Sequence, residues 1–303
     1  MIDANVLGSA IMCMNSYPHS KDIIMHGVRA LEWIIHAGKS DVWRLMVDEG
    51  VRDIIVQALA EYNDADVVTY TSSLLTQLVK AMSVSSSLPS PLDPALVASF
   101  VLNSTLLSTV KDSMLRNTAN ESVLGALAMI LAVLVANSGG GLSRSRVEEV
   151  AAALIQNDFC RVLLMSLQHA QLPANVRLIT GVLWKCCLDR WRGVASSLVE
   201  DGRAAFYQAS GIDGVIEVLQ HYPNDVVLQR NCCGCLLLMT RDCGCGDGAS
   251  PADPSVGSVM MSRLAVSLVM DALQDCPRES QLAIQAIPLL QAVCVKSGET
   301  DCC

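Results

Sequence analysis

A twelve-residue pattern of apolar positions recurs six times along the chain, and this repetition limits the fold more than any other feature. The pattern places apolar residues at positions 1, 5, 8, 9 and 12, which form one broad stripe on a helix. The six copies contain no gaps and begin at Ile23, Val67, Val123, Val176, Leu228 and Leu282. We call each copy a block and predict that all six form equivalent helices. In this register the ninth residues, Leu75, Trp184 and Leu290 among them, are expected in the core.

A second helical pattern lies upstream of most blocks. It begins at Val51, Phe159, Ile212 and Leu264. Gly50 and Gly211 each precede a β-branched residue, as expected where one helix ends and the next begins. The repeat is thus predicted to be a helix pair or triplet. Breaker-rich stretches at 83–94, 137–146 and 241–258 are predicted to be linkers.

One helix pair cannot bury its own apolar face, so six units are expected to stack into one continuous core. The predicted fold is an all-α solenoid, a single domain over residues 1–303. Composition agrees, because 51% of the chain is hydrophobic and only 4% aromatic, which disfavours a large β-sandwich or barrel. The approximate units are 1–40, 41–83, 95–137, 147–190, 191–240 and 259–298.

The stretch from Gly211 to Met239 resembles an armadillo repeat, through its helix-opening Gly-Ile and its paired apolar positions. Residues 50–78 resemble it less strictly, and the other units share only the pattern of the third helix. HEAT-type repeats have much of this pattern in common. The resemblance implies a right-handed superhelix of about six armadillo-like repeats. It also implies a protein-binding scaffold whose third helices line a groove.

The chain departs from this family at the eleventh position of the block. Importin-like and catenin-like relatives carry asparagine there, and the resemblance implies that its amide clamps the backbone of an extended peptide. The equivalent residues of this chain are Trp33, Gln77, Val133, Cys186, Leu238 and Ala292. Only Gln77 can substitute for that amide, so clamping of an extended nuclear-localisation peptide is not expected. A groove this apolar suits an amphipathic helix, unless it is covered.

Basic and aromatic residues supply the candidates for partner binding. Trp33 is a candidate groove anchor, while the alternative is a core residue. Positive charge is concentrated in the fourth and fifth units, where it could bind an acidic segment or phosphate, or simply form a solvated face. The basic candidates are Arg177, Lys185, Arg190, Arg192 and Arg203.

Charge and hydropathy limit the partners. The net charge is −9, which repels nucleic acid and anionic lipid.

The uncharged stretch 122–143 is continuously apolar only over 123–136, too short to cross about 30 Å of hydrocarbon. The N-terminus lacks a basic signal region, so a cytoplasmic location is expected, with the nucleus also open. We expect a protein partner, and a monomer or weak oligomer.

No motif for catalysis or cofactor binding is visible, so no enzyme activity, cofactor or metal is expected. Cys232 and Cys235 fall in core columns and are predicted to be packed thiols. Cys243 and Cys245 could instead form a redox or metal pair. The terminal Cys302–Cys303 resembles a prenylated tail, and the alternative is a frayed end.

These observations favour a non-catalytic scaffold or adaptor. It would bind another protein along the concave face of the solenoid or through the loop at 241–258. Two alternatives stay open. One is a chaperone cofactor, since some similar armadillo-like proteins act as nucleotide-exchange factors on Hsp70. The other is a regulatory helical-repeat segment of a larger protein.

Overall fold

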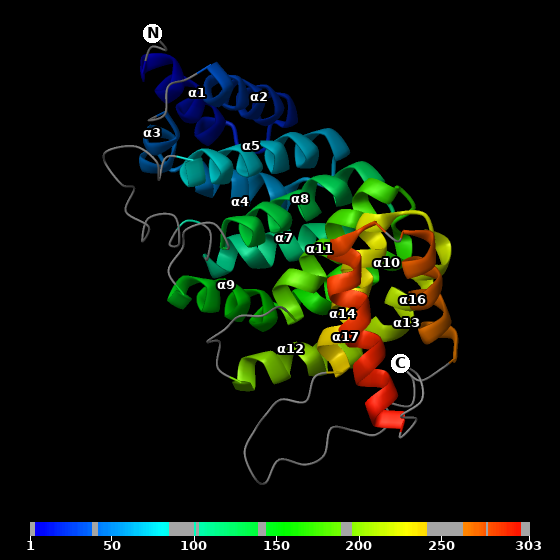
Figure 1. Ribbon diagram of the computed structural model, residues 1–303. Helices are drawn as coiled ribbons and strands as arrows, with labels where there is room; N and C mark the ends of the chain where they lie inside the picture. The colour runs from blue at the N-terminus through cyan, green and yellow to red at the C-terminus, as the bar shows by residue number, and fades with distance from the viewer. Residues whose placement is uncertain are drawn as a thin grey trace. The chain divides into compact units, whose positions relative to one another are not determined.

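The computed structural model describes the backbone of residues 4–37, 42–84, 100, 103–138, 144–188, 196–240, 263–276 and 278–297. Helices connected by short turns make up these ranges, and no strand occurs in them (Figure 1). The prediction of an all-α fold is confirmed. Contacts divide the chain into two compact units, which are described separately below.

Unit 1 comprises residues 1–157 together with 169–171. Its helices are α1 (Ala4–Ser16), α2 (Lys21–Ala37), α3 (Val42–Asp48), α4 (Val51–Glu61), α5 (Ala65–Val84), α7 (Ser104–Arg116), α8 (Glu121–Ser138) and α9 (Arg144–Gln156). Unit 2 comprises residues 158–168 and 172–303. Its helices are α10 (Phe159–His169), α11 (Pro173–Leu188), α12 (Ser196–Gln208), α13 (Gly211–His221), α14 (Val226–Thr240), α16 (Arg263–Asp275) and α17 (Ser280–Ser297).

The six blocks lie in α2, α5, α8, α11, α14 and α17, which we call the block helices. In unit 1, α5 packs against both α2 and α8. In unit 2, α14 packs in the same way against α11 and α17. The preceding helices also contact one another, α4 with α7 and α13 with α16. The upstream pattern predicted α4, α10, α13 and α16, while it missed α1, α3, α7, α9 and α12.

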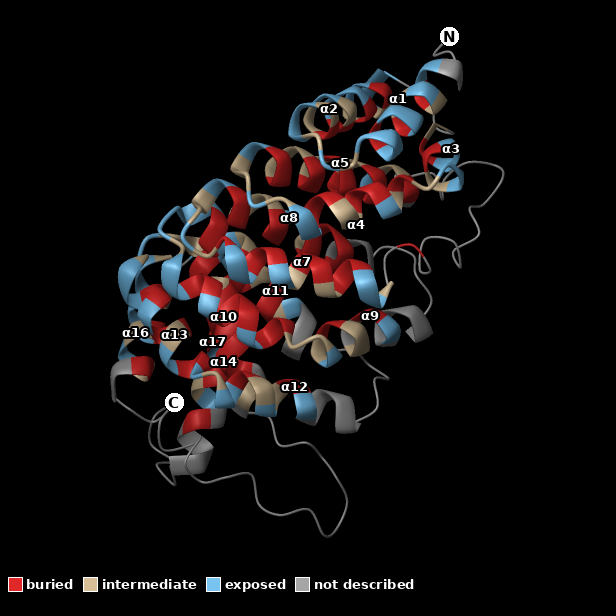
Figure 2. Cartoon of the chain, turned by 180° about the vertical axis from the view of Figure 1, so that it is seen from behind, coloured by how far each residue is buried: buried red, intermediate tan, exposed pale blue. Residues whose placement is uncertain are grey.

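Burial follows the predicted stripe through most of its length (Figure 2). The fifth residues of the second and fifth blocks, Thr71 and Cys232, are completely buried. The ninth residues Leu31, Leu75, Leu131 and Leu236 are at most 1% exposed. Helix α8, which carries no charge after Glu121, is also buried along most of its length. No helix in the described ranges is long and apolar enough to cross a membrane.

The register differs from the prediction in two blocks of unit 2. Trp184 and Leu290, expected in the core, are only half-buried. The residues just before them, Leu183 and Leu289, are 0% and 4% exposed. In α11 and α17 the most buried position of this turn is therefore one residue earlier, and the ninth position lies at the edge of the apolar stripe.

Left-handed residues form three equivalent junctions between helices. Gly50 has a φ of 80°, Asp158 of 57° and Ser210 of 56°. They directly precede α4, α10 and α13. This conformation ends one helix and starts the next within two residues, which confirms the prediction at Gly50. Gly211, the other predicted boundary residue, is instead the first residue of α13.

Gly211 is required by packing instead of by backbone conformation. A Cβ added there would lie 2.6 Å from the ring of Phe206, which is completely buried in α12. The left-handed conformation falls on Ser210, a residue with a side chain and so with a steric cost.

This division of roles predicts opposite effects for neighbouring substitutions. Gly211→Ala should destabilise the protein by about 1–3 kcal/mol, because the ring of Phe206 must move. Ser210→Gly should leave the stability unchanged or raise it by up to about 1 kcal/mol, because glycine adopts positive φ without strain. Urea unfolding of both variants checks this pair. Equal destabilisation by the two substitutions would contradict it.

Polar side chains fasten the helix ends of unit 1. Arg116, at the end of α7, donates to the carbonyl oxygens of Leu59 at 2.6 Å and Ala60 at 3.0 Å, and to Asn63 Oδ1 at 2.8 Å. A positive charge at the C-terminus of α4 also interacts favourably with the helix dipole. The α4–α7 contact therefore combines apolar packing with a charged cap.

A second set of polar contacts joins the start of α2 to the connection between α4 and α5. Lys21 Nζ lies 2.5 Å from Asp64 Oδ2, and His19 Nδ1 lies 3.0 Å from Glu61 Oε2. Asp64 Oδ1 also accepts the backbone N–H groups of Asp66 and Val67. The hydrogen bond from Lys21 is the main cause that lowers the pKa of Asp64 below 3.8. The hydrogen bond from Gln57, followed by that from His19, lowers the pKa of Glu61.

The lowered pKa of Asp64 predicts a loss of stability in acid. The unfolded carboxylate binds protons more readily than the folded one, so its contribution is present above its ordinary pKa and is lost as pH falls through the folded value. Asp64→Asn should lower the melting temperature at neutral pH, and the difference from wild type should shrink towards pH 3. Thermal melting from pH 7 to 3 measures this. A constant difference across that range would contradict the assignment.

Candidate partner-binding surfaces

In unit 1 the candidate surface lies on the exposed faces of α2 and α5. Trp33 on α2 is 72% exposed. One turn earlier on α2, the Arg29 guanidinium carbon lies 5.0 Å from the centre of the Tyr70 ring on α5. Gln77 is half-buried further along α5. We call these four residues, Arg29, Trp33, Tyr70 and Gln77, the Trp33 surface.

The Trp33 surface is held together by contacts between its two helices. Arg29 over Tyr70 is a cation–π pair at a distance where the attraction is significant. Ser73 on α5 donates its hydroxyl to the Glu32 carboxylate on α2. Two nearby contacts therefore fix α2 against α5 and leave the indole of Trp33 pointing into solvent. The structure thus places Trp33 outside the core, while no signal in the sequence identified Arg29 or Tyr70.

In unit 2 two of the five predicted basic residues, Arg177 and Lys185, fall on α11. Arg177 is exposed, and its Nε lies 2.7 Å from Asp225 Oδ2, so an internal carboxylate compensates its charge. Asp225 Oδ1 also accepts the N–H of Leu228 at the start of α14. Lys185 is exposed two turns after Arg177. Arg190 and Arg192 lie outside the described residues, and Arg203 is half-buried on α12.

Trp184 crosses from α11 to α14. A Cβ added at Gly234 would lie 2.4 Å from Trp184 Nε1, so the indole rests directly on the α14 backbone. The guanidinium carbon of Arg230, one turn before Gly234, lies 5.7 Å from the centre of the same ring. Trp184 is therefore an interhelical element at the edge of the core, in contact with a positive charge. The sequence prediction assigned it to the core and gave Arg230 no role.

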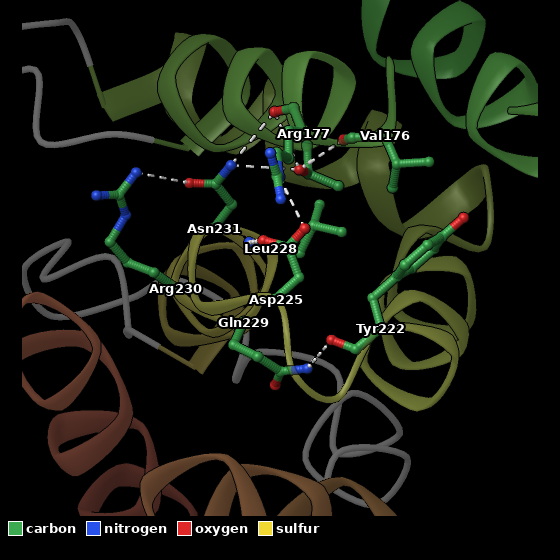
Figure 3. A network of polar contacts seen from close by, with 9 residues as sticks. Val176, Arg177, Tyr222, Asp225, Leu228, Gln229, Arg230 and Asn231 are labelled. Carbon is green, nitrogen blue, oxygen red and sulfur yellow. Dashed lines mark hydrogen bonds and ion pairs between the residues drawn. The ribbon is translucent and has the colours of Figure 1, made fainter. Parts of the chain in front are cut away.

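Asn231 is the polar centre of this region (Figure 3). It is buried, and its Nδ2 donates to the Arg177 carbonyl and to Thr180 Oγ1, both at 3.3 Å. Its Oδ1 accepts from Arg230 at 3.4 Å. Next to it, Gln229 Nε2 donates to the carbonyls of Leu219 and Tyr222. The start of α14 is thus tied to both α11 and α13.

The eleventh block positions do not supply a repeated amide. Trp33 is exposed, Gln77 half-buried and Val133 8% exposed. The side chains of the other three residues, Cys186, Leu238 and Ala292, lie outside the described set. Among the eleventh residues whose side chains are described, Gln77 is the one that carries an amide.

The cysteines of α14 belong to the core. Cys232 and Cys235 are completely buried, which confirms their predicted position, and Cys233 is buried as well. Burial raises the pKa of the Cys232 thiol, and that of Cys233 to about 12. The thiols of Cys232 and Cys233 are accordingly protonated and unreactive at neutral pH. Among the described residues, no three His, Cys, Asp or Glu side chains gather as a metal site would require. Four further cysteines, Cys243, Cys245, Cys302 and Cys303, lie outside the described residues.

Comparison with known proteins gives a likeness of fold. No protein-family model matches the chain, and no curated protein matches it. The solved crystal structure of an engineered protein from a structural genomics consortium is similar, with a TM-score of 0.64 and 14% sequence identity. The match covers 97% of this chain and 99% of the engineered one. At this identity the likeness concerns the fold alone.

The contact between Trp184 and Gly234 predicts a position-specific cost of adding one methyl group. Gly234→Ala should lower the free energy of unfolding by about 1–3 kcal/mol, because its Cβ collides with the indole. Gly8→Ala on α1 is the matched control: nothing lies within 4 Å of an added Cβ, and alanine favours a helix by up to about 1 kcal/mol. Urea unfolding compares the two. If both variants were stabilised, the indole could not rest on α14 as described.

Proposed function

We propose that the chain is a non-catalytic, armadillo-like scaffold that binds a segment of another protein through the exposed faces of its block helices. The proposed architecture is a right-handed α-solenoid of about six armadillo-like repeats, each a helix pair or triplet. Three features support it: each of the six block helices is preceded by a companion helix, the block helices pack in series within each unit, and a left-handed junction recurs before α4, α10 and α13. The likeness to the engineered structure supports a shared fold and carries no information on binding.

The exposure of Trp33 is the observation that carries the binding proposal. A tryptophan that is 72% exposed leaves a large apolar surface in water, which burial against a partner would remove. Tryptophan, tyrosine and arginine are also the residue types that dominate the binding energy of protein interfaces. The Trp33 surface contains one of each.

The Trp33 surface is ordered before any partner binds. Arg29 is held over Tyr70, and the neighbouring Ser73–Glu32 hydrogen bond fixes the spacing of α2 and α5. Less conformational entropy is lost on binding when side chains are already in place. On a preformed surface of this kind, the side chains of a partner can be anchored directly. The scaffold does not need to refold around the partner.

The chemistry of the surface defines the partner segment. An apolar side chain is needed against Trp33, and an acidic one suits the cationic Arg29. With a single amide at the eleventh positions described, a ladder that clamps a long extended backbone is not supported. An amphipathic helix with an apolar stripe flanked by acidic residues meets these requirements.

Binding should therefore depend on Trp33 far more than on other exposed apolar residues. Peptides would be selected against the whole protein from a displayed library of amphipathic sequences, and their affinities measured by fluorescence anisotropy. Trp33→Ala should weaken the selected peptides by about 30-fold or more, equivalent to a loss of about 2 kcal/mol. Met12→Ala is the matched control, because Met12 is 66% exposed on α1 and should change affinity little.

Selected peptides that bind Trp33→Ala as tightly as wild type would contradict the assignment of this surface. Turnover of a substrate by the purified protein, with no peptide selected, would contradict the scaffold itself.

A further inference from the structure

Arg230 is a cation without an internal counter-ion among the described residues. No described carboxylate lies within ion-pair distance of it, whereas Arg177 on the neighbouring helix is 2.7 Å from Asp225. Its Nε is buried and has no hydrogen-bond partner in the described part of the chain. Its one described hydrogen bond goes to Asn231 Oδ1, at 3.4 Å. The buried Nε cannot reach a partner, so the donors that this half-buried guanidinium offers are those of its terminal nitrogens.

The surroundings of Arg230 hold it in place without neutralising it. The Trp184 ring lies 5.7 Å from the guanidinium carbon, and the indole can occupy that position because residue 234 is glycine. Asn231, whose Oδ1 accepts a hydrogen bond from the guanidinium, is itself anchored to Thr180 and to the Arg177 carbonyl. Both supports are neutral. They restrict the rotamers of Arg230, as required of a binding residue that must not pay ordering entropy.

We propose that Arg230, positioned by Trp184 and Asn231, is a binding subsite for a carboxylate side chain of a protein partner. Lys185, the exposed residue that follows Trp184 on α11, adds positive charge to unit 2. This inference rests on the proposed scaffold function and adds a specificity element in unit 2, separate from the Trp33 surface in unit 1.

A carboxylate fits the donors of Arg230 better than other anions do. The planar guanidinium matches the two oxygens of a carboxylate, and the bond gains strength where the arginine is partly withdrawn from water. A phosphate site normally gathers several cations or backbone N–H groups, and Arg177 is already committed to Asp225.

The test uses a fluorescein-labelled hexaglutamate peptide as the probe, with the full-length chain and fluorescence anisotropy at low salt. Wild type should bind the probe. Arg230→Gln should weaken binding by about tenfold, and Arg230→Lys by about threefold, because lysine keeps the charge but loses the planar fork. Arg161→Gln is the matched control. It removes the same charge from unit 2, at an arginine that is 66% exposed on α10, and should change affinity less than about twofold.

Trp184→Leu separates positioning from general electrostatics. It leaves every charge in place, so a fall in affinity of about three- to fivefold would show that the indole positions the Arg230 guanidinium. Circular dichroism and urea unfolding would verify that each variant is folded. The subsite would be overturned if Arg230→Gln and Arg161→Gln lowered the affinity for the probe equally. The attraction would then be non-specific.

Two further outcomes would also overturn the subsite. One is a wild-type protein that does not bind hexaglutamate. If amphipathic peptides still bound through Trp33, this failure would leave the scaffold function standing. The other is a preference for a ten-nucleotide oligouridylate or for inorganic phosphate over the peptide, which would reassign Arg230 to a different anion.

Discussion

The structure depends on the burial of one broad apolar stripe on each block helix against the next block helix. In unit 1, α5 is covered on two sides by α2 and α8, and in unit 2, α14 is covered by α11 and α17. Hydrophobic burial of this kind is non-directional, so it fixes which faces meet but not which residues do. The polar contacts at the helix ends supply that second level of definition.

Two of those polar contacts share one arrangement. A long side chain on one helix donates to carbonyls near the end of another, as Arg116 does for α4 and Gln229 for α13. Such carbonyls have no partner within their own helix, so the bonds satisfy groups that would otherwise need water. The result is a register between neighbouring helices that the apolar stripes alone could not set.

Much of the fold could be predicted from sequence, because helix periodicity is a local property. Thr71, Leu75 and Leu236 follow the stripe closely, and four of the six companion helices carry a clear pattern of their own. The other helices outside the blocks, α1, α3, α7, α9 and α12, were missed because the pattern found in the four companions does not extend to them. Likewise, the left-handed residue before α13 is Ser210, and serine is not a residue type that predicts positive φ.

The candidate surfaces were harder to predict, because they depend on pairs of residues from different helices. The position of Trp184 is set by Gly234, fifty residues away and on another helix, so the block register alone placed the indole in the core. Arg29 and Arg230 gained significance only once Tyr70 and Trp184 were seen beside them. Both units thus contain an arginine held against an aromatic ring of a neighbouring block helix, a relationship invisible along the chain.

Amide hydrogen exchange of the intact protein, resolved by mass spectrometry, tests the central packing most directly. The middle block helix of each unit, α5 and α14, should exchange most slowly, because each is covered on two sides and opens only with its unit. The first helix, α1, should exchange much faster. Exchange in α5 and α14 as fast as in α1 would show that these helices are not the packed centres of their units, and the account would fail.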